Sequence, residues 1–140
     1  MKRTLLFYGL LFLTLLNCKS QHYTFDELPS KQLVFGYGGG MAGTVDRYIL
    51  LENGQLFHTN SLIEQTEELA PLSKKEANAC FLKLEELALS EADFDHPGSR
   101  YYFLEEVNQN IKHKVVWGSS DHKPDKAYLE FYNEMKNHIK

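Results

Sequence analysis

Apolar residues recur along this chain with two spacings, the alternation typical of strands and the longer repeat typical of helices. The first apolar run, Leu33–Phe35, leads into a stretch rich in glycine. Two β-prone runs then flank Asn53-Gly54, a dipeptide that supplies positive-φ residues to a type I′ turn. The pattern predicts an initial strand followed by a hairpin whose two-residue loop pairs Leu51 with Leu56.

A helical pattern follows this hairpin. Ser73 and Glu76 have the spacing of a capping box, in which each side chain accepts a hydrogen bond from the other residue's backbone amide. Apolar residues then recur on one helical face: Ala77, Cys80, Phe81, Leu84, Leu87 and Ala88. The segment therefore predicts a helix that covers a hydrophobic core.

The last part of the chain predicts a second hairpin and a second helix. The β-prone runs 101–107 and 111–117 flank the polar loop 108–110. Pro124 suits a first helical turn, and an apolar stripe follows it: Ala127, Tyr128, Phe131, Met135 and Ile139. Residues 33–140 are expected to form a single α+β domain, with an antiparallel sheet built from two hairpins plus an initial strand and with two helices packed on one face.

The N-terminus is typical of an export signal. Lys2 and Arg3 form a positively charged region, and residues 5–16 are almost entirely apolar. This apolar segment is too short to cross a bilayer core of about 30 Å comfortably. The pattern predicts a cleaved signal peptide over residues 1–17, and a short uncleaved membrane helix is the alternative.

The residues around Cys18 resemble the lipobox of bacterial lipoproteins. Leu15 and Cys18 match that motif, whereas the two residues between them are larger than usual. The resemblance implies a lipid on the Cys18 thiol, and the polar residues 18–32, interrupted by Pro29, are expected to form a flexible tether. Because residues 19–21 include no acidic residue, the same resemblance implies anchoring in the outer membrane, facing the periplasm.

Composition and charge narrow the class of protein. A chain of 140 residues, 43% of them hydrophobic, can bury one core. The formal charge of −4 and the absence of a Lys/Arg cluster argue against nucleic-acid binding. Cys18 and Cys80 are the only cysteines, so an acylated Cys18 leaves Cys80 without a disulfide partner. We expect Cys80 to pack as a small buried hydrophobe.

The stretch FGYGGGMAG, residues 35–43, holds five of the nine glycines. Its spacing matches G-x-G-x-x-G, but a dinucleotide site needs a helix directly after the last glycine, where a strand is predicted here. Two interpretations stay open: a strained connection between strands, or a loop whose small residues let a partner approach closely. The candidate partner-binding loop comprises Gly39, Gly40, Met41, Ala42 and Gly43.

Catalytic and metal-binding patterns are weak. The histidines lack H-x-x-x-H spacing, and no serine lies in G-x-S-x-G. Asp93, Asp95 and His96 offer too few oxygen ligands for a calcium loop. We therefore expect no enzymatic activity, no metal and no cofactor.

The chain from about Gly38 to Lys140 resembles two groups of proteins. The segments Phe35–Gly40, Glu52–Gly54 and Trp117-Gly118 resemble those of small bacterial lipoproteins of uncharacterised function. The segment Gly39–Gly43 and the order of elements are more distantly similar to emfourin-type inhibitors of thermolysin-like metalloproteases, which have an aromatic residue where Met41 stands. This second resemblance implies inhibition through an exposed surface.

The sequence therefore predicts a lipid-anchored envelope protein that binds a protein or peptide partner, with a thermolysin-like metalloprotease as the candidate. Two alternatives remain open. One is a structural or assembly lipoprotein of the outer membrane, and the other is a small ligand-binding module or hydrolase.

Overall fold

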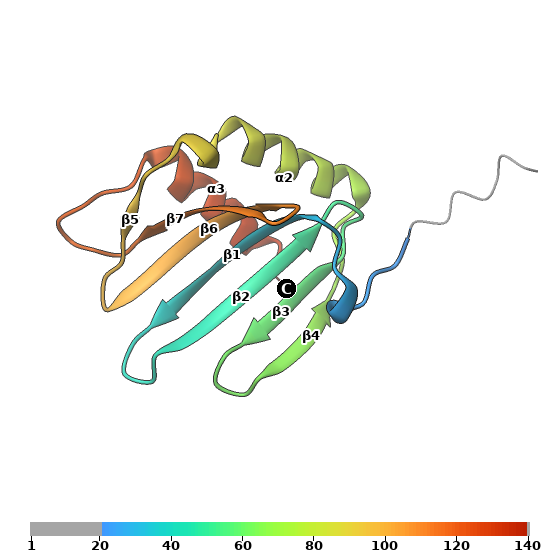
Figure 1. The fold of residues 1–140 in the computed structure, drawn as a ribbon, viewed down its shortest axis with the longest axis horizontal. Helices are drawn as coiled ribbons and strands as arrows, with labels where there is room; N and C mark the ends of the chain where they lie inside the picture. The colour runs from blue at the N-terminus through green and yellow to red at the C-terminus, as the bar shows by residue number, and fades with distance from the viewer. Residues whose placement is uncertain (1–20, 140) are drawn as a thin grey trace, which may run out of the picture.

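The computed structural model describes residues 21–139, which form one seven-stranded sheet with two α-helices (Figure 1). The elements are η2 (Phe25–Glu27), β1 (Lys31–Gly39), β2 (Thr44–Leu51), β3 (Leu56–Asn60), β4 (Gln65–Leu69), α2 (Lys74–Glu86), η3 (Leu89–Glu91), β5 (Asp95–His96), β6 (Arg100–Asn108), β7 (Ile111–Trp117) and α3 (Lys126–Asn137). The expected signal peptide, residues 1–17, and the acylated Cys18 lie outside the described residues. The fold is α+β, as predicted.

The sheet has the strand order β4-β3-β2-β1-β6-β7-β5. All neighbouring strands are antiparallel except β5 and β7, so the sheet is mixed. The predicted sheet of two hairpins plus one strand lacked both edge strands. β4 was missed because its sequence, QTEEL, has no apolar alternation, and β5 because it is only two residues long.

Strand β1 is longer than predicted and includes three of the glycines. A Cβ atom at Gly36 would lie 2.8 Å from the ring of Phe103, and one at Gly38 would lie 2.6 Å from the ring of Tyr101. Both rings belong to β6, which pairs with β1. These glycines therefore make room for aromatic rings that cross the strand, and they belong to the sheet rather than to a loop.

The hairpin at Asn53-Gly54 forms, but its register differs from the prediction by one residue. Leu50, not Leu51, pairs with Leu56. Only Gly54 has a positive φ, 96°, and Leu51 N donates to Gln55 O across the turn. The turn is a three-residue loop that ends in a glycine bulge rather than a type I′ turn.

Both helices pack on the same face of the sheet (Figure 1). The predicted capping box of α2 is confirmed by reciprocal hydrogen bonds between Ser73 and Glu76. The core beneath the helices combines residues of α2, α3 and the strands: Leu33, Phe35, Leu50, Leu56, Ala77, Cys80, Phe81, Leu84, Leu104, Val115, Trp117, Phe131, Tyr132 and Met135. Cys80 is buried, as expected, and burial raises the pKa of its thiol to about 11.

A second apolar cluster lies on the opposite face, and the start of the described chain covers part of it. Tyr23 and Leu28 pack against this cluster, and the ring of Phe25 lies 6.0 Å from that of Phe57. Gln55 Oε1 accepts a hydrogen bond of 2.7 Å from Tyr23 N. The expected tether over residues 18–32 is therefore wrong from Tyr23 onward, because that segment packs on the sheet and its last two residues begin β1.

Candidate functional site

The predicted loop, Gly39–Gly43, connects β1 to β2 at one end of the sheet (Figure 1). Gly39 ends β1 and pairs with Thr44, so residues 40–43 make the turn itself. Met41 is fully exposed, and its neighbours in the turn are exposed as well. The structure thus places Gly40, Met41, Ala42 and Gly43 in an accessible hairpin turn, with Gly39 at the end of β1.

The base of this loop is packed against the start of β6. Gly39 has a φ of 94°, and a Cβ atom there would lie 2.2 Å from Ser99 O. Gly40 N donates to the same carbonyl at 2.7 Å. No larger residue can occupy position 39 without moving this backbone, which agrees with the interpretation of the base as a constrained connection between strands. The interpretation of the loop as a partner-binding site stays a prediction.

A second hairpin tip lies at the same end of the sheet (Figure 1). Residues 61–64 connect β3 to β4, and Leu62 and Ile63 are 67% and 62% exposed. This loop is attached to the start of β2, since Val45 N donates to Ser61 Oγ at 2.8 Å and Ser61 N donates to Val45 O at 3.0 Å. We call the exposed side chains of Met41, Leu62 and Ile63 the tip residues.

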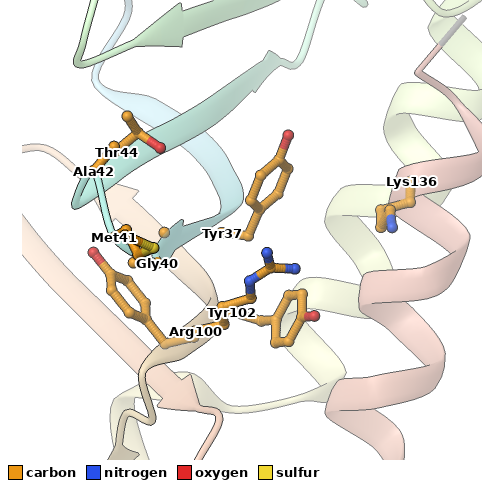
Figure 2. Close-up of a pocket in the computed structure, with 11 residues that line it drawn as sticks. Tyr37, Gly40, Met41, Ala42, Thr44, Arg100, Tyr102 and Lys136 are labelled. Atoms are coloured by element: carbon orange, nitrogen blue, oxygen red, sulfur yellow. The ribbon is translucent and has the colours of Figure 1, made fainter.

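A pocket of about 440 Å³ lies beside the first loop on the helix-covered side of the sheet (Figure 2). Tyr37 and Tyr102 are direct cross-strand neighbours, and their side chains are 40% and 36% exposed. In Figure 2 the guanidinium of Arg100 lies in the space between these two rings, and Lys136 faces them from α3. The pocket thus combines aromatic walls with two cationic groups.

A polar cluster from three strands lies behind the tip residues. His58 Nε2 lies 2.8 Å from Asp46 Oδ1, and His58 Nδ1 lies 3.2 Å from Glu67 Oε1. The ring of Tyr48 stacks on the imidazole with centroids 4.6 Å apart. Both imidazole nitrogens face carboxylates, which leaves neither one to act as a base toward a substrate. The cluster therefore holds three strands together rather than forming a catalytic triad.

Hydrogen bonding keeps Asp46 charged in this cluster. Burial by itself would raise the pKa of the Asp46 carboxyl, but hydrogen bonds from Asn60 and His58 hold that pKa below its usual value. Asn60 Nδ2 donates to Asp46 Oδ1 at 2.9 Å. Burial also raises the pKa of the Tyr48 hydroxyl to about 12, so this group stays neutral at physiological pH.

Other candidate chemistry from the sequence is not brought together. Within residues 21–139, no cluster of three or more His, Cys, Asp or Glu side chains is arranged to hold a metal ion. In the same part of the chain, no helix combines the length and the apolar composition needed to span a bilayer. Cys18, the predicted site of lipid attachment, lies outside it.

Sequence reasoning missed the pocket and the polar cluster. Tyr37, Arg100 and Tyr102 meet because β1 pairs with β6, and His58 meets Asp46 because β2 pairs with β3. The signal available in the sequence was the position of Tyr37, two residues after Phe35 and so on the same face of the strand.

The chain matches no protein-family model, and no curated protein is significantly similar to it.

Proposed function

We propose that this protein is a lipid-anchored component of the bacterial envelope that binds a protein or peptide partner through the loop end of its sheet. The observation that carries this proposal is the full exposure of Met41 on a loop whose base is packed against backbone. A methionine offers a flexible, polarisable contact, and a fixed base lowers the entropy lost on binding.

The second exposed loop supports the same proposal. Leu62 and Ile63 add two large apolar side chains at the end of the sheet where Met41 lies. Exposed apolar groups gathered at one end of a domain are typical of an interaction site. A contact that includes both loops would bury more apolar surface than either loop alone.

The attachment of the N-terminal segment also fits this arrangement. Asn53 Nδ2 donates to Gln21 O at 2.7 Å, so the start of the described chain lies at the end of the sheet opposite the tip residues. A lipid on Cys18 would hold that end close to the membrane. Because β1 has nine residues, the tip residues would face away from the bilayer at a distance of about 30 Å.

A thermolysin-like metalloprotease is the partner that the emfourin resemblance suggests. The proposed mechanism is occlusion, in which Met41 enters the active-site cleft while the backbone of the loop resists the extended geometry of a substrate. Two hydrogen bonds support this rigidity: Gly40 N to Ser99 O at 2.7 Å and Gly43 N to Gly40 O at 3.2 Å. A loop held in this way would block the cleft without being cleaved readily.

The test is a titration of the full chain, in a nonionic detergent, against a thermolysin-like metalloprotease. Cleavage of a peptide substrate gives the activity, and mass spectrometry reports whether the chain stays intact. Stoichiometric inhibition by an intact chain is the expected result. Digestion or lack of inhibition would eliminate this protease as the partner, and crosslinking in native envelopes would then test for a structural or assembly role.

The pocket favours a second candidate function, that of a small ligand-binding module. Its aromatic walls and its two cationic side chains could hold an anionic group. A hydrolase is less well supported, because the two nitrogens of His58 already face Asp46 and Glu67. Retention of a metabolite through gentle purification would favour the ligand-binding candidate.

A further inference from the structure

The two cationic side chains in the pocket have no acidic partner within residues 21–139. Neither Arg100 nor Lys136 forms an ion pair there, and no Asp or Glu lines the pocket. Several other basic side chains do pair with carboxylates: Arg47 with Glu105, Lys31 with Glu85, Lys83 with Glu134, and Lys126 with Glu130. In a chain with a net charge of −4, this pocket is a local positive site.

The geometry of Arg100 suits a carboxylate. A guanidinium presents parallel N–H donors that match the two oxygens of a carboxylate, which gives short and directional hydrogen bonds. The hydroxyl group of the Tyr102 side chain can add a further donor, whereas that of Tyr37 already interacts with Asp46 and Tyr48. Lys136 lies in the last turn of α3, where its charge also stabilises the helix end, so we expect Arg100 to contribute more to binding.

The loop amides argue against a phosphate. Phosphate sites in proteins usually present several free backbone N–H groups to the anion. Here Gly40 N donates to Ser99 O, and Gly43 N donates to Gly40 O. Two of the four amides of residues 40–43 are thus already used, which leaves few for a phosphate, so side chains must supply most of the recognition of the anion.

The walls of the pocket indicate what carries the carboxylate. The rings of Tyr37 and Tyr102 provide apolar surface around Arg100, and Met41 also lines the pocket. A volume of about 440 Å³ holds one large side chain together with a carboxylate. The last residue of a peptide has this chemistry, since its carboxylate and its side chain share one Cα atom.

We infer that this pocket binds the C-terminal residue of a peptide, with Arg100 pairing with the terminal carboxylate and the tyrosine rings contacting the last side chain. The inference rests on the proposed function, since it names the part of the partner that enters the site. The preceding residues of that partner would then pass over the exposed loop at Met41.

The test measures fluorescence anisotropy with the full chain in nonionic detergent. The probe is a fluorescein-labelled pentapeptide that ends in phenylalanine, with either a free carboxylate or a C-terminal amide. The free acid is expected to bind at least tenfold more tightly than the amide. Arg100→Gln should remove this preference, and Arg100→Lys should restore part of it by keeping the charge without the planar fork. Lys112→Gln, which removes an exposed charge from the opposite face, should leave it unchanged.

Several outcomes would overturn the inference. Equal binding of acid and amide, or no binding of either, would exclude recognition of the carboxylate. Displacement by inorganic phosphate but not by acetate would assign the pocket to phosphate. Competition by N-acetylphenylalanine as strong as that of the pentapeptide would assign it to small carboxylates. If Met41→Asp abolishes binding of a protein partner while Arg100→Gln has no effect, the proposed function stands and this inference fails.

Discussion

The two ends of the sheet use glycine turns for different purposes. At the end near the N-terminal segment, Gly54 is buried in its turn, where Leu72 N donates to Gly54 O and the next residue, Gln55, is only 5% exposed. At the other end, a Cβ atom at Gly43 would meet nothing within 4 Å, and Met41 is fully exposed. The first turn is held by contacts with the rest of the fold, whereas the second is exposed, and it is the surface that we propose for partner binding.

The two turns can be compared directly by substituting alanine for glycine in each of them and measuring the free energy of unfolding. Gly54 has a φ of 96°, and a Cβ atom there would lie 2.2 Å from Leu72 O. Gly54→Ala therefore adds a backbone clash to the cost of a positive φ and should lower the free energy of unfolding by about 3 kcal/mol or more. Urea denaturation of the full chain in detergent measures the effect.

The matched control for this substitution is Gly43→Ala. Gly43 has a φ of 62°, and a Cβ atom there meets nothing within 4 Å. Only the cost of the left-handed conformation remains, about 1–2 kcal/mol. Equal losses at the two positions would show that neighbouring atoms do not distinguish the two turns.

The next largest loss in the free energy of unfolding is expected from a substitution at Gln55. This residue links the turn containing Gly54 to the N-terminal segment. Its Oε1 accepts hydrogen bonds from Tyr23 N at 2.7 Å and Asn53 Nδ2 at 2.6 Å, and its Nε2 donates to Tyr23 O at 3.0 Å. Gln55→Ala removes the side-chain partner of Tyr23 N and Tyr23 O and should cost about 2 kcal/mol. Hydrogen exchange should then quicken at Tyr23, whereas the exposed control Gln65→Ala should change neither quantity.

The same contrast explains which features could be predicted from the sequence. The helix beginning at Lys74 depends on the contact between Ser73 and Glu76, which are near in sequence, and it was predicted correctly. The packing of the N-terminal segment depends on hydrogen bonds between Gln55 and Tyr23, which are 32 residues apart, and the sequence predicted a flexible tether there. Contacts between residues near in sequence could be predicted from the sequence, but contacts between distant segments could not.

The candidate site divides in the same way. The loop at Met41 was identified because its glycines are consecutive in sequence. The pocket was missed because Tyr37 and Tyr102 meet only through the pairing of β1 with β6. Strand β4 was missed because QTEEL has no apolar face to indicate that it joins a sheet.

A smaller energetic effect, confined to binding, is expected at the exposed end. Met41→Asp places a charge on a fully exposed side chain, so the free energy of unfolding should change by less than about 0.5 kcal/mol. Affinity for the protein partner should fall at least tenfold, because the aspartate would have to lose its hydration in an apolar contact. Surface plasmon resonance against the protease, or against a crosslinked partner, measures this loss.

The control for Met41→Asp lies at the opposite end of the sheet. Ile111 is 59% exposed beside the turn between β6 and β7, so Ile111→Asp makes the same change from an apolar to an acidic side chain. Its affinity for the partner should remain that of the unmodified protein. If both substitutions weaken binding equally, the loop end is not the contact surface.

The smallest change in the free energy of unfolding is expected when the pH is lowered and Asp46, in the polar cluster behind the tip residues, becomes protonated. Because the folded-state pKa of Asp46 is lowered, its carboxylate adds stability above its usual pKa of 3.8, and this stability is lost as pH falls through the lower folded-state value. Asp46→Asn removes the ionisable carboxyl group. The unfolding free energy of this variant should therefore fall less steeply between pH 5 and about pH 2 than that of the unmodified protein. Asp93→Asn makes the same substitution at an exposed position outside the cluster. If Asp93→Asn reduces the pH dependence of the unfolding free energy as much as Asp46→Asn does, the hydrogen bonds from Asn60 and His58 are not what lowers the pKa of Asp46.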